Sequence, residues 1–220
     1  MDHAVALVQA YLYVNGYFTV AEYPVVKALP RSGYATATDI DLLALRLPEA
    51  GGIVPARKPR QQGNEPGFRT DPALAADQVN PEMLLAEVKE GKAALNRGAT
   101  DPAVVRAVLS RFGCCPEEHL SAHVQELLRK GNTQMPSGLR VRQVVFGSLA
   151  QGGGRHLKIS LGHVLEFLRK HVRDNWSILR HVQVKDPVFG LLVLAEKARR
   201  AATSREQTRL RGPNAKGGTA

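Results

Sequence analysis

The sequence has few cysteines, few aromatic residues and no long hydrophobic run, and each shortage excludes a class of protein. The two cysteines, Cys114 and Cys115, are neighbours, so they form no disulfide framework, and two thiols alone make no zinc site. Aromatic residues make up only 5% of the chain, so base stacking along single-stranded nucleic acid is not indicated. Because no run of about 18 uncharged apolar residues occurs, we expect no transmembrane helix.

The sequence does contain an ordinary apolar fraction and an excess of basic residues. With 220 residues, of which 44% are hydrophobic, the chain can form one domain with appendages or two small domains. The formal net charge of +10 indicates partners that are rich in phosphate. The first residues, Met-Asp-His, lack the basic region that opens a secretory signal, so we expect a cytoplasmic protein.

Local patterns predict an opening helix, three strands, further helices and a fourth strand. The expected helices cover residues 4–14 and begin again at 101, 115, 160 and 186; the expected strands cover 17–29, 38–45, 83–89 and 140–146, with residues 33–38 joining the first two. This order predicts an α/β fold with an α+β-like order of elements. We expect a central mixed sheet flanked by helices rather than a doubly wound parallel sheet.

Residues 49–81 interrupt the pattern. They are rich in Pro, Gly, Gln and Arg and have few apolar residues, so we expect a mobile insertion. We therefore divide the chain into a core over 1–150 that carries the insertion, a helical extension over 151–204, and a basic, disordered tail over 205–220.

Two expected strands carry charged side chains where a core strand would carry apolar ones. Residues two apart on a strand share a face, so Asp39 and Asp41 point one way, and so do Glu87 and Lys89. If the strands are neighbours, Asp41, Glu87 and Lys89 converge at one end of the sheet. Carboxylates this close need a cation, and hard oxygen ligands favour Mg²⁺ or Mn²⁺. A lysine beside that metal can orient or deprotonate a water, which indicates phosphodiester hydrolysis.

These residues resemble the PD-(D/E)XK nuclease superfamily, which includes type II restriction enzymes and Holliday-junction resolvases. The resemblance rests on Asp41 followed by Leu-Leu-Ala, and on Glu87-Val88-Lys89 behind an apolar run. The helix ending in Asn15-Gly16-Tyr17-Phe18 also resembles the one that opens the resolvase-like core. The resemblance covers the first two-thirds of the chain and implies a restriction-endonuclease-like αβββαβ core, followed here by C-terminal helices. It implies that Asp41 and Glu87 bind the metal, helped by the Val88 carbonyl, and that Lys89 is the catalytic lysine.

The sequence departs from the family pattern in two respects. Many resolvase-like members carry a glutamate on the first helix, where this chain offers only Asp2 and Gln9, so we consider Glu22 on the first strand as a third acid. The spacing from Asp41 to Glu87 is long, and it requires the insertion to leave the sheet and return. We assign Asp39 to a turn or a supporting position rather than to the metal.

Four arginines are candidates for contact with a phosphate backbone, namely Arg140, Arg142, Arg199 and Arg200. Together with the carboxylate site they favour a Mg²⁺-dependent endonuclease that acts on DNA rather than RNA, in repair, recombination or phage defence. No membrane partner is expected, and a homodimer is left open. Two alternatives remain: a non-catalytic nucleic-acid-binding or assembly module that keeps the nuclease fold, and an unrelated α+β protein in which the motif is fortuitous.

Overall fold

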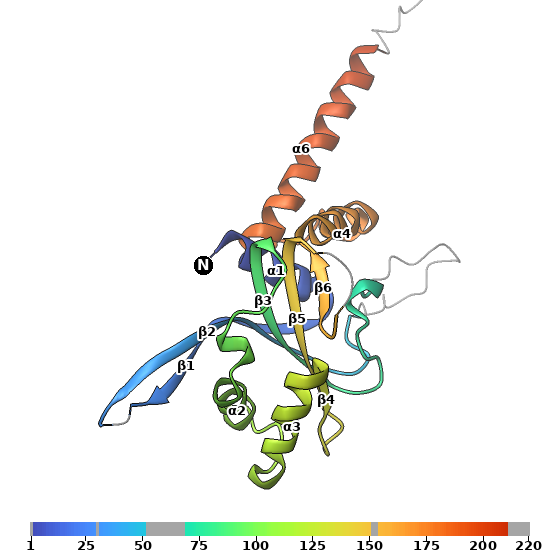
Figure 1. Cartoon of the computed structure of the whole chain (residues 1–220). Helices are drawn as coiled ribbons and strands as arrows, with labels where there is room; N and C mark the ends of the chain where they lie inside the picture. Colours follow the sequence, from blue (N-terminus) through green and yellow to red (C-terminus); the bar gives the residue numbers. More distant parts are fainter. Residues whose placement is uncertain (1, 30, 52–68, 151–153, 211–220) are drawn as a thin grey trace, which may run out of the picture.

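Six strands form one mixed sheet in the part of the chain that the structure, a computed structural model, describes: residues 2–29, 31–51, 69–150 and 154–210 (Figure 1). The strands are β1 (Tyr17–Ala28), β2 (Tyr34–Arg46), β3 (Glu82–Lys92), β4 (Asn132–Gln134), β5 (Arg140–Leu149) and β6 (Leu157–Ser160). β1, β2 and β3 are antiparallel neighbours, and β3 pairs with β5 in parallel. The far side of β5 pairs first with β4, antiparallel, and then with β6, parallel.

Helices cover both faces of this sheet. One face carries α1 (His3–Val14), α4 (Leu161–Asp174), α5 (Trp176–Leu179) and the start of α6 (Pro187–Leu210); the other carries α2 (Pro102–Arg111) and α3 (Glu117–Lys130). Alternate residues of β3 serve the two faces: Leu84 and Ala86 pack under α1, and Met83 and Leu85 pack under α2 and α3. The predicted α/β class with a mixed sheet between helices is therefore confirmed.

The helix starts follow the capping signals in the sequence. Asp2, Asp101 and Ser160 each accept a hydrogen bond from a backbone N–H in the first turn of α1, α2 and α4. The prediction for the C-terminal tail is wrong at its beginning, because α6 continues to Leu210 rather than ending near residue 204. Residues 211–220 lie outside the described residues.

The strand boundaries differ from prediction where the elements are short or polar. β2 begins at Tyr34 rather than at 38, so the connection to β1 is shorter than the expected one. β4 and β6 have three and four residues, too few to show a periodicity in the sequence, and neither was predicted. β6 and α4 complete the same sheet and core as the first 150 residues.

Residues 69–81 of the expected mobile insertion pack on the body, so the prediction is wrong for this part. Leu74, in the short 3₁₀ helix η1 (Pro72–Leu74), is fully buried. Arg46, also fully buried, donates to the backbone oxygens of Ala50 at 2.7 Å and Asp77 at 2.8 Å and to Oε1 of Gln78 at 3.0 Å. One guanidinium thus ties both ends of the insertion to the sheet. The insertion's residues 52–68 lie outside the described residues.

No helix within the described ranges has both the length and the apolar character needed to cross a membrane.

The buried His171 of α4 predicts a pH-dependent stability. Burial lowers the pKa of His171 to about 4, against the opposing charge of Asp174. The unfolded chain binds a proton near pH 6.5 and the folded chain does not, so stability is complete above that pH and falls as the pH drops from 6.5 towards 4. We expect this histidine to cost about 2 kcal/mol of unfolding free energy between pH 7 and 5.

Urea unfolding of the wild type and of His171→Gln at both pH values measures this effect. The variant should lose less stability on acidification than the wild type, and the exposed His181 changed to Gln serves as the control. Equal losses in the wild type and in His171→Gln would contradict the prediction.

Candidate metal and catalytic site

Asp41 is fixed where β2 separates from β3. The backbone hydrogen bonding between these strands ends at the pair Leu42–Ala86. The next N–H of β3 that points towards β2, that of Val88, therefore has no backbone partner there. The Oδ2 atom of Asp41 accepts this N–H at 2.7 Å. The aspartate therefore replaces a ladder bond, and its carboxylate is held against β3 beside Glu87.

Glu87 is a buried carboxylate next to Asp41. Its side chain is 2% exposed, while that of Asp41 is 23% exposed. Burial and the charge of Asp41 raise the pKa of Glu87, although hydrogen bonds from Lys89 and Asn96 oppose them. The two acids thus repel each other across a partly dry site, which favours a cation between them.

Lys89 supplies one such cation. Its Nζ forms a close ion pair with Oε1 of Glu87 and lies 4.0 Å from Oδ2 of Asp41. Burial alone would lower the pKa of Lys89, but the hydrogen bond and charge of Glu87, followed by the charges of Asp41 and Asp2, raise it. The lysine is therefore an ammonium ion at neutral pH. The structure thus brings together the three side chains that the sequence singled out.

Two residues that the sequence did not assign to the site also act on it. Asp2, the N-cap of α1, lies near enough for its charge to raise the pKa of Lys89, whereas Gln9 turns to the hydroxyl of Thr19. Asn96 follows β3 in a loop, and its side chain lies near enough to Glu87 to lower the pKa of that carboxyl. No local pattern marks Asn96, because its role depends on the return of the loop to the sheet.

Glu22 lies on β1 between the residues that pair with Leu42 and Ile40, hence across from Asp41. Its φ of 53° is in the left-handed region, which is strained for a residue other than glycine. Leu42 packs in one core cluster and Ile40 in the other, so the hairpin twists sharply at this point. Within the described ranges no three His, Cys, Asp or Glu side chains gather to hold a metal, so Glu22 does not complete a third ligand here.

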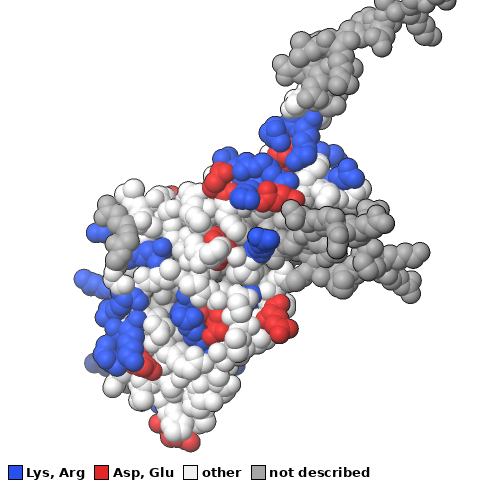
Figure 2. All heavy atoms as spheres, turned by 90° about the vertical axis from the view of Figure 1, so that its right-hand side faces the viewer, with Lys and Arg blue, Asp and Glu red and all other residues white. Residues whose placement is uncertain are grey.

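The four candidate arginines differ in their surroundings. Arg142 is buried and forms an ion pair with Glu82, Nε to Oε1 at 2.7 Å, so it stabilises the fold and faces no external phosphate; that expectation is corrected. Arg140 is more exposed and lies 3.7 Å from the same carboxylate. Arg199 and Arg200 both bind Glu196. Figure 2 shows Lys and Arg gathered near the base of α6 with acidic side chains among them.

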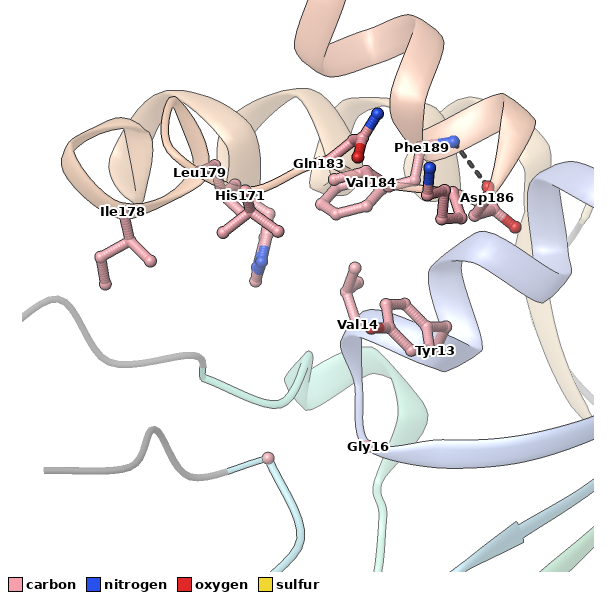
Figure 3. A pocket seen from close by; sticks show the side chains of 13 residues that line it. Tyr13, Val14, Gly16, His171, Ile178, Leu179, Gln183, Val184, Asp186 and Phe189 are labelled. Carbon is pink, nitrogen blue, oxygen red and sulfur yellow. Dashed lines mark hydrogen bonds between the residues drawn. The ribbon is translucent and has the colours of Figure 1, made fainter.

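A separate hollow of about 650 Å³ lies at the opposite end of α1 from Asp2 (Figure 3). It is lined mainly by apolar side chains of α1 and of the α4–α6 connection, among them Val14, Leu179 and Phe189. None of the residues of the acidic site lines it. The hollow therefore belongs to the C-terminal helices rather than to the chemistry of Asp41 and Glu87.

The donor set fits a hard divalent cation. Asp41 and Glu87 offer two carboxylates, and Mg²⁺ is commonly held by one or two carboxylates together with water and substrate phosphates. The raised pKa of Glu87, caused in part by Asp41, indicates negative charge that a divalent ion would relieve.

Comparisons of the chain with protein-family models, with curated proteins and with solved structures found no match.

Gly147 gives a test of how tightly the site is packed. It pairs with Lys89 across the parallel ladder, and a Cβ there would lie 2.8 Å from the backbone of Ala93. Gly147→Ala should therefore displace the end of β3 and reduce the unfolding free energy by about 1–3 kcal/mol. Gly91→Ala is the matched control, because a Cβ on Gly91 meets nothing within 4 Å. Denaturant unfolding compares the two variants. Equal stability of Gly147→Ala and Gly91→Ala would show that the end of β3 can move to accommodate the added methyl group without cost.

Proposed function

We propose that this chain is a metal-dependent endonuclease of the PD-(D/E)XK type that hydrolyses phosphodiester bonds in DNA. The observation that carries the proposal is the position of the Lys89 ammonium, which touches Glu87 and lies 4.0 Å from Asp41. The order of elements, a helix, three antiparallel strands, helices and a parallel strand, supports it as well. The fold alone would not define an activity; the site does.

Asp41 and Glu87, with the Val88 carbonyl, would hold Mg²⁺ or Mn²⁺. When bound, such an ion lowers the pKa of a water and stabilises charge on a phosphoryl oxygen. Val88 N–H keeps the Asp41 carboxylate in place, and burial of Glu87 keeps water from competing for it. Lys89 is positively charged. It would donate a hydrogen bond either to the attacking water, which it would orient, or to a phosphate oxygen, whose negative charge it would stabilise.

Nicking of a supercoiled plasmid tests the proposal. The wild type should convert it to the open circular form with Mg²⁺ or Mn²⁺ and not with EDTA. Asp41→Asn should lose this activity. Asp39→Asn should keep it, because Asp39 lies exposed two residues away on the same strand. Absence of cleavage by the wild type with either metal, or equal cleavage by wild type and Asp41→Asn, would refute the proposed activity.

A second candidate is a nucleic-acid-binding module without catalysis. It is favoured by the described site having two acids rather than three, with Lys89 already neutralising part of their charge. Salt-sensitive binding of DNA by the wild type, without cleavage in Mg²⁺ or Mn²⁺, would support this candidate over the first.

A further inference from the structure

The β1–β2 hairpin extends well beyond the sheet. β2 pairs with β3 only from Leu42 to Arg46, but it pairs with β1 as far as Tyr34. The outer part is a two-stranded ribbon that projects from the body (Figure 1). It contains six residue pairs, from Tyr23–Ile40 to Ala28–Tyr34, which at about 3.3 Å per residue extend about 20 Å.

The ribbon begins at the acidic site. Asp41 is the residue at which β2 leaves the sheet, so the catalytic strand and the ribbon are one continuous segment. The base of the ribbon is held by the 3₁₀ helix η2 (Gly98–Thr100): a Cβ on Gly98 would lie 2.6 Å from the side chain of Thr38. Asn96 precedes η2 and accepts the N–H of Ala99 at 2.6 Å, and its side chain lies near enough to Glu87 to lower the pKa of that carboxyl. Ribbon and site therefore share one support.

The outer ribbon, residues 26–36, is cationic in sequence, and none of its described side chains is buried. Val25 of β1 is buried, at 4% exposed, the register shifts after it, and Val26 and Lys27 are exposed. Lys27 and Arg31 are exposed, the sequence from 26 to 36 contains no Asp or Glu, and neither cation has an acidic partner among the described side chains. Lys170 of α4 and Arg199 and Arg200 of α6 differ, because each forms an ion pair with an acidic side chain.

The two faces of the outer ribbon have different characters. Paired residues of an antiparallel ribbon share a face, so Val26, Thr36 and Tyr34 lie on one face and Lys27 on the other. Val26 is 53% exposed and Tyr34 77% exposed. The aromatic, methyl-rich face suits the base edges of a duplex groove, while Lys27 on the opposite face and Arg31 in the turn have side chains long enough to reach phosphates.

We propose that the outer ribbon is an arm that holds a DNA duplex against the acidic site; the inference rests on the proposed function. A two-stranded ribbon fits the major groove, which is about 12 Å wide. Lys27 and Arg31 bind phosphates at the groove's rims, and the face of Val26, Tyr34 and Thr36 contacts base edges, where thymine methyl groups offer apolar contacts. The site at the base of the arm then faces the backbone of the same duplex.

The test measures binding of a labelled 25-base-pair duplex across a salt series, in full-length protein carrying Lys89→Ala to prevent cleavage. Adding Lys27→Gln and Arg31→Gln should raise Kd about tenfold near 100 mM salt and reduce the salt slope by about 2. Tyr34→Ala should raise Kd about fivefold or more with the slope unchanged. The charge-matched control is Arg129→Gln with Arg180→Gln, two exposed arginines on α3 and at the end of α5. Thermal unfolding verifies that each variant folds.

The outcomes separate this inference from the proposed function. If the parent binds the duplex, the wild type nicks plasmid and the arm variants bind like the parent, the arm is refuted and the endonuclease stands. Equal weakening by the control pair refutes it too, because binding would then be spread over the surface. If arm substitutions only convert a dimer to a monomer in sedimentation, the face joins two copies of the chain. If the wild type neither binds nor cleaves DNA, both the endonuclease proposal and the arm are refuted.

Discussion

A Lys89→Ala variant should bind Mn²⁺ but nick plasmid at least about 100-fold more slowly than the wild type. The ammonium of Lys89 is the group that can orient a water or stabilise charge on a phosphate, and no other Lys or Arg forms an ion pair with Asp41 or Glu87 in the described ranges. Its removal also takes away a cation that competes with the metal for Glu87. The loss should therefore appear in turnover and not in metal affinity.

Calorimetry with Mn²⁺ tests whether Lys89→Ala still binds the metal; an alkaline pH, 8, is used because burial raises the pKa of Glu87 and a higher pH favours its ionised form. Plasmid nicking at the same pH measures turnover. Lys92→Ala is the control, because Lys92 is exposed three residues further along β3. Parallel loss of Mn²⁺ binding and cleavage in Lys89→Ala would mean that the lysine only maintains the site's shape.

Changing Glu82 to Ala should reduce the unfolding free energy by about 3–5 kcal/mol. Glu82 is fully buried and accepts hydrogen bonds from Nη2 of Arg142 at 3.0 Å and from the hydroxyl of Tyr17 at 2.5 Å, and its Oε1 forms an ion pair with Nε of Arg142 at 2.7 Å. Without the carboxylate, a buried guanidinium keeps its charge and loses its counter-ion, which costs more than the pair itself contributes.

Urea unfolding at pH 7 measures this effect, and Glu90→Ala, at an exposed position on the same strand, should change stability by less than about 0.5 kcal/mol. Combining Glu82→Ala with Arg142→Met should recover part of the loss, since the unpaired charge is then gone. A loss below about 1 kcal/mol for Glu82→Ala would show that water reaches Arg142.

Much of the fold could be predicted because its signals are local. Asp2, Asp101 and Ser160 cap helices through their own side chains, and the unbroken apolar run of β3, residues 83–86, marks a strand buried on both faces. The convergence of Asp41, Glu87 and Lys89 followed from the period of two along β3 plus the assumption that β2 and β3 are neighbours, which they are. On β2 this period breaks at Asp41, because Ile40 and Leu42 pack in different core clusters.

The rest depends on contacts between distant segments. From the sequence alone Arg142 is indistinguishable from a surface cation, because Glu82, its partner, is distant along the chain. The same holds for Arg46, whose hydrogen-bond acceptors lie at both ends of the insertion. The composition of residues 69–81 predicted a mobile segment, but Leu74 and Asp71 are buried in it. The left-handed backbone of Glu22 could not be predicted, because nothing in the sequence marks the twist of the hairpin opposite Asp41.

The edge of β5 is covered by two strands, β4 and β6, which leave the ribosome at different times during synthesis. β4 protects residues 140–142 of β5 as soon as both have left the ribosome, but the partner of residues 144–147 is β6, which emerges later together with α4. Until then a hydrophobic strand edge and the apolar side of α1 are open to other chains. We therefore expect a chain truncated after residue 150 to aggregate, because the edge of β5 and the apolar side of α1 would stay uncovered.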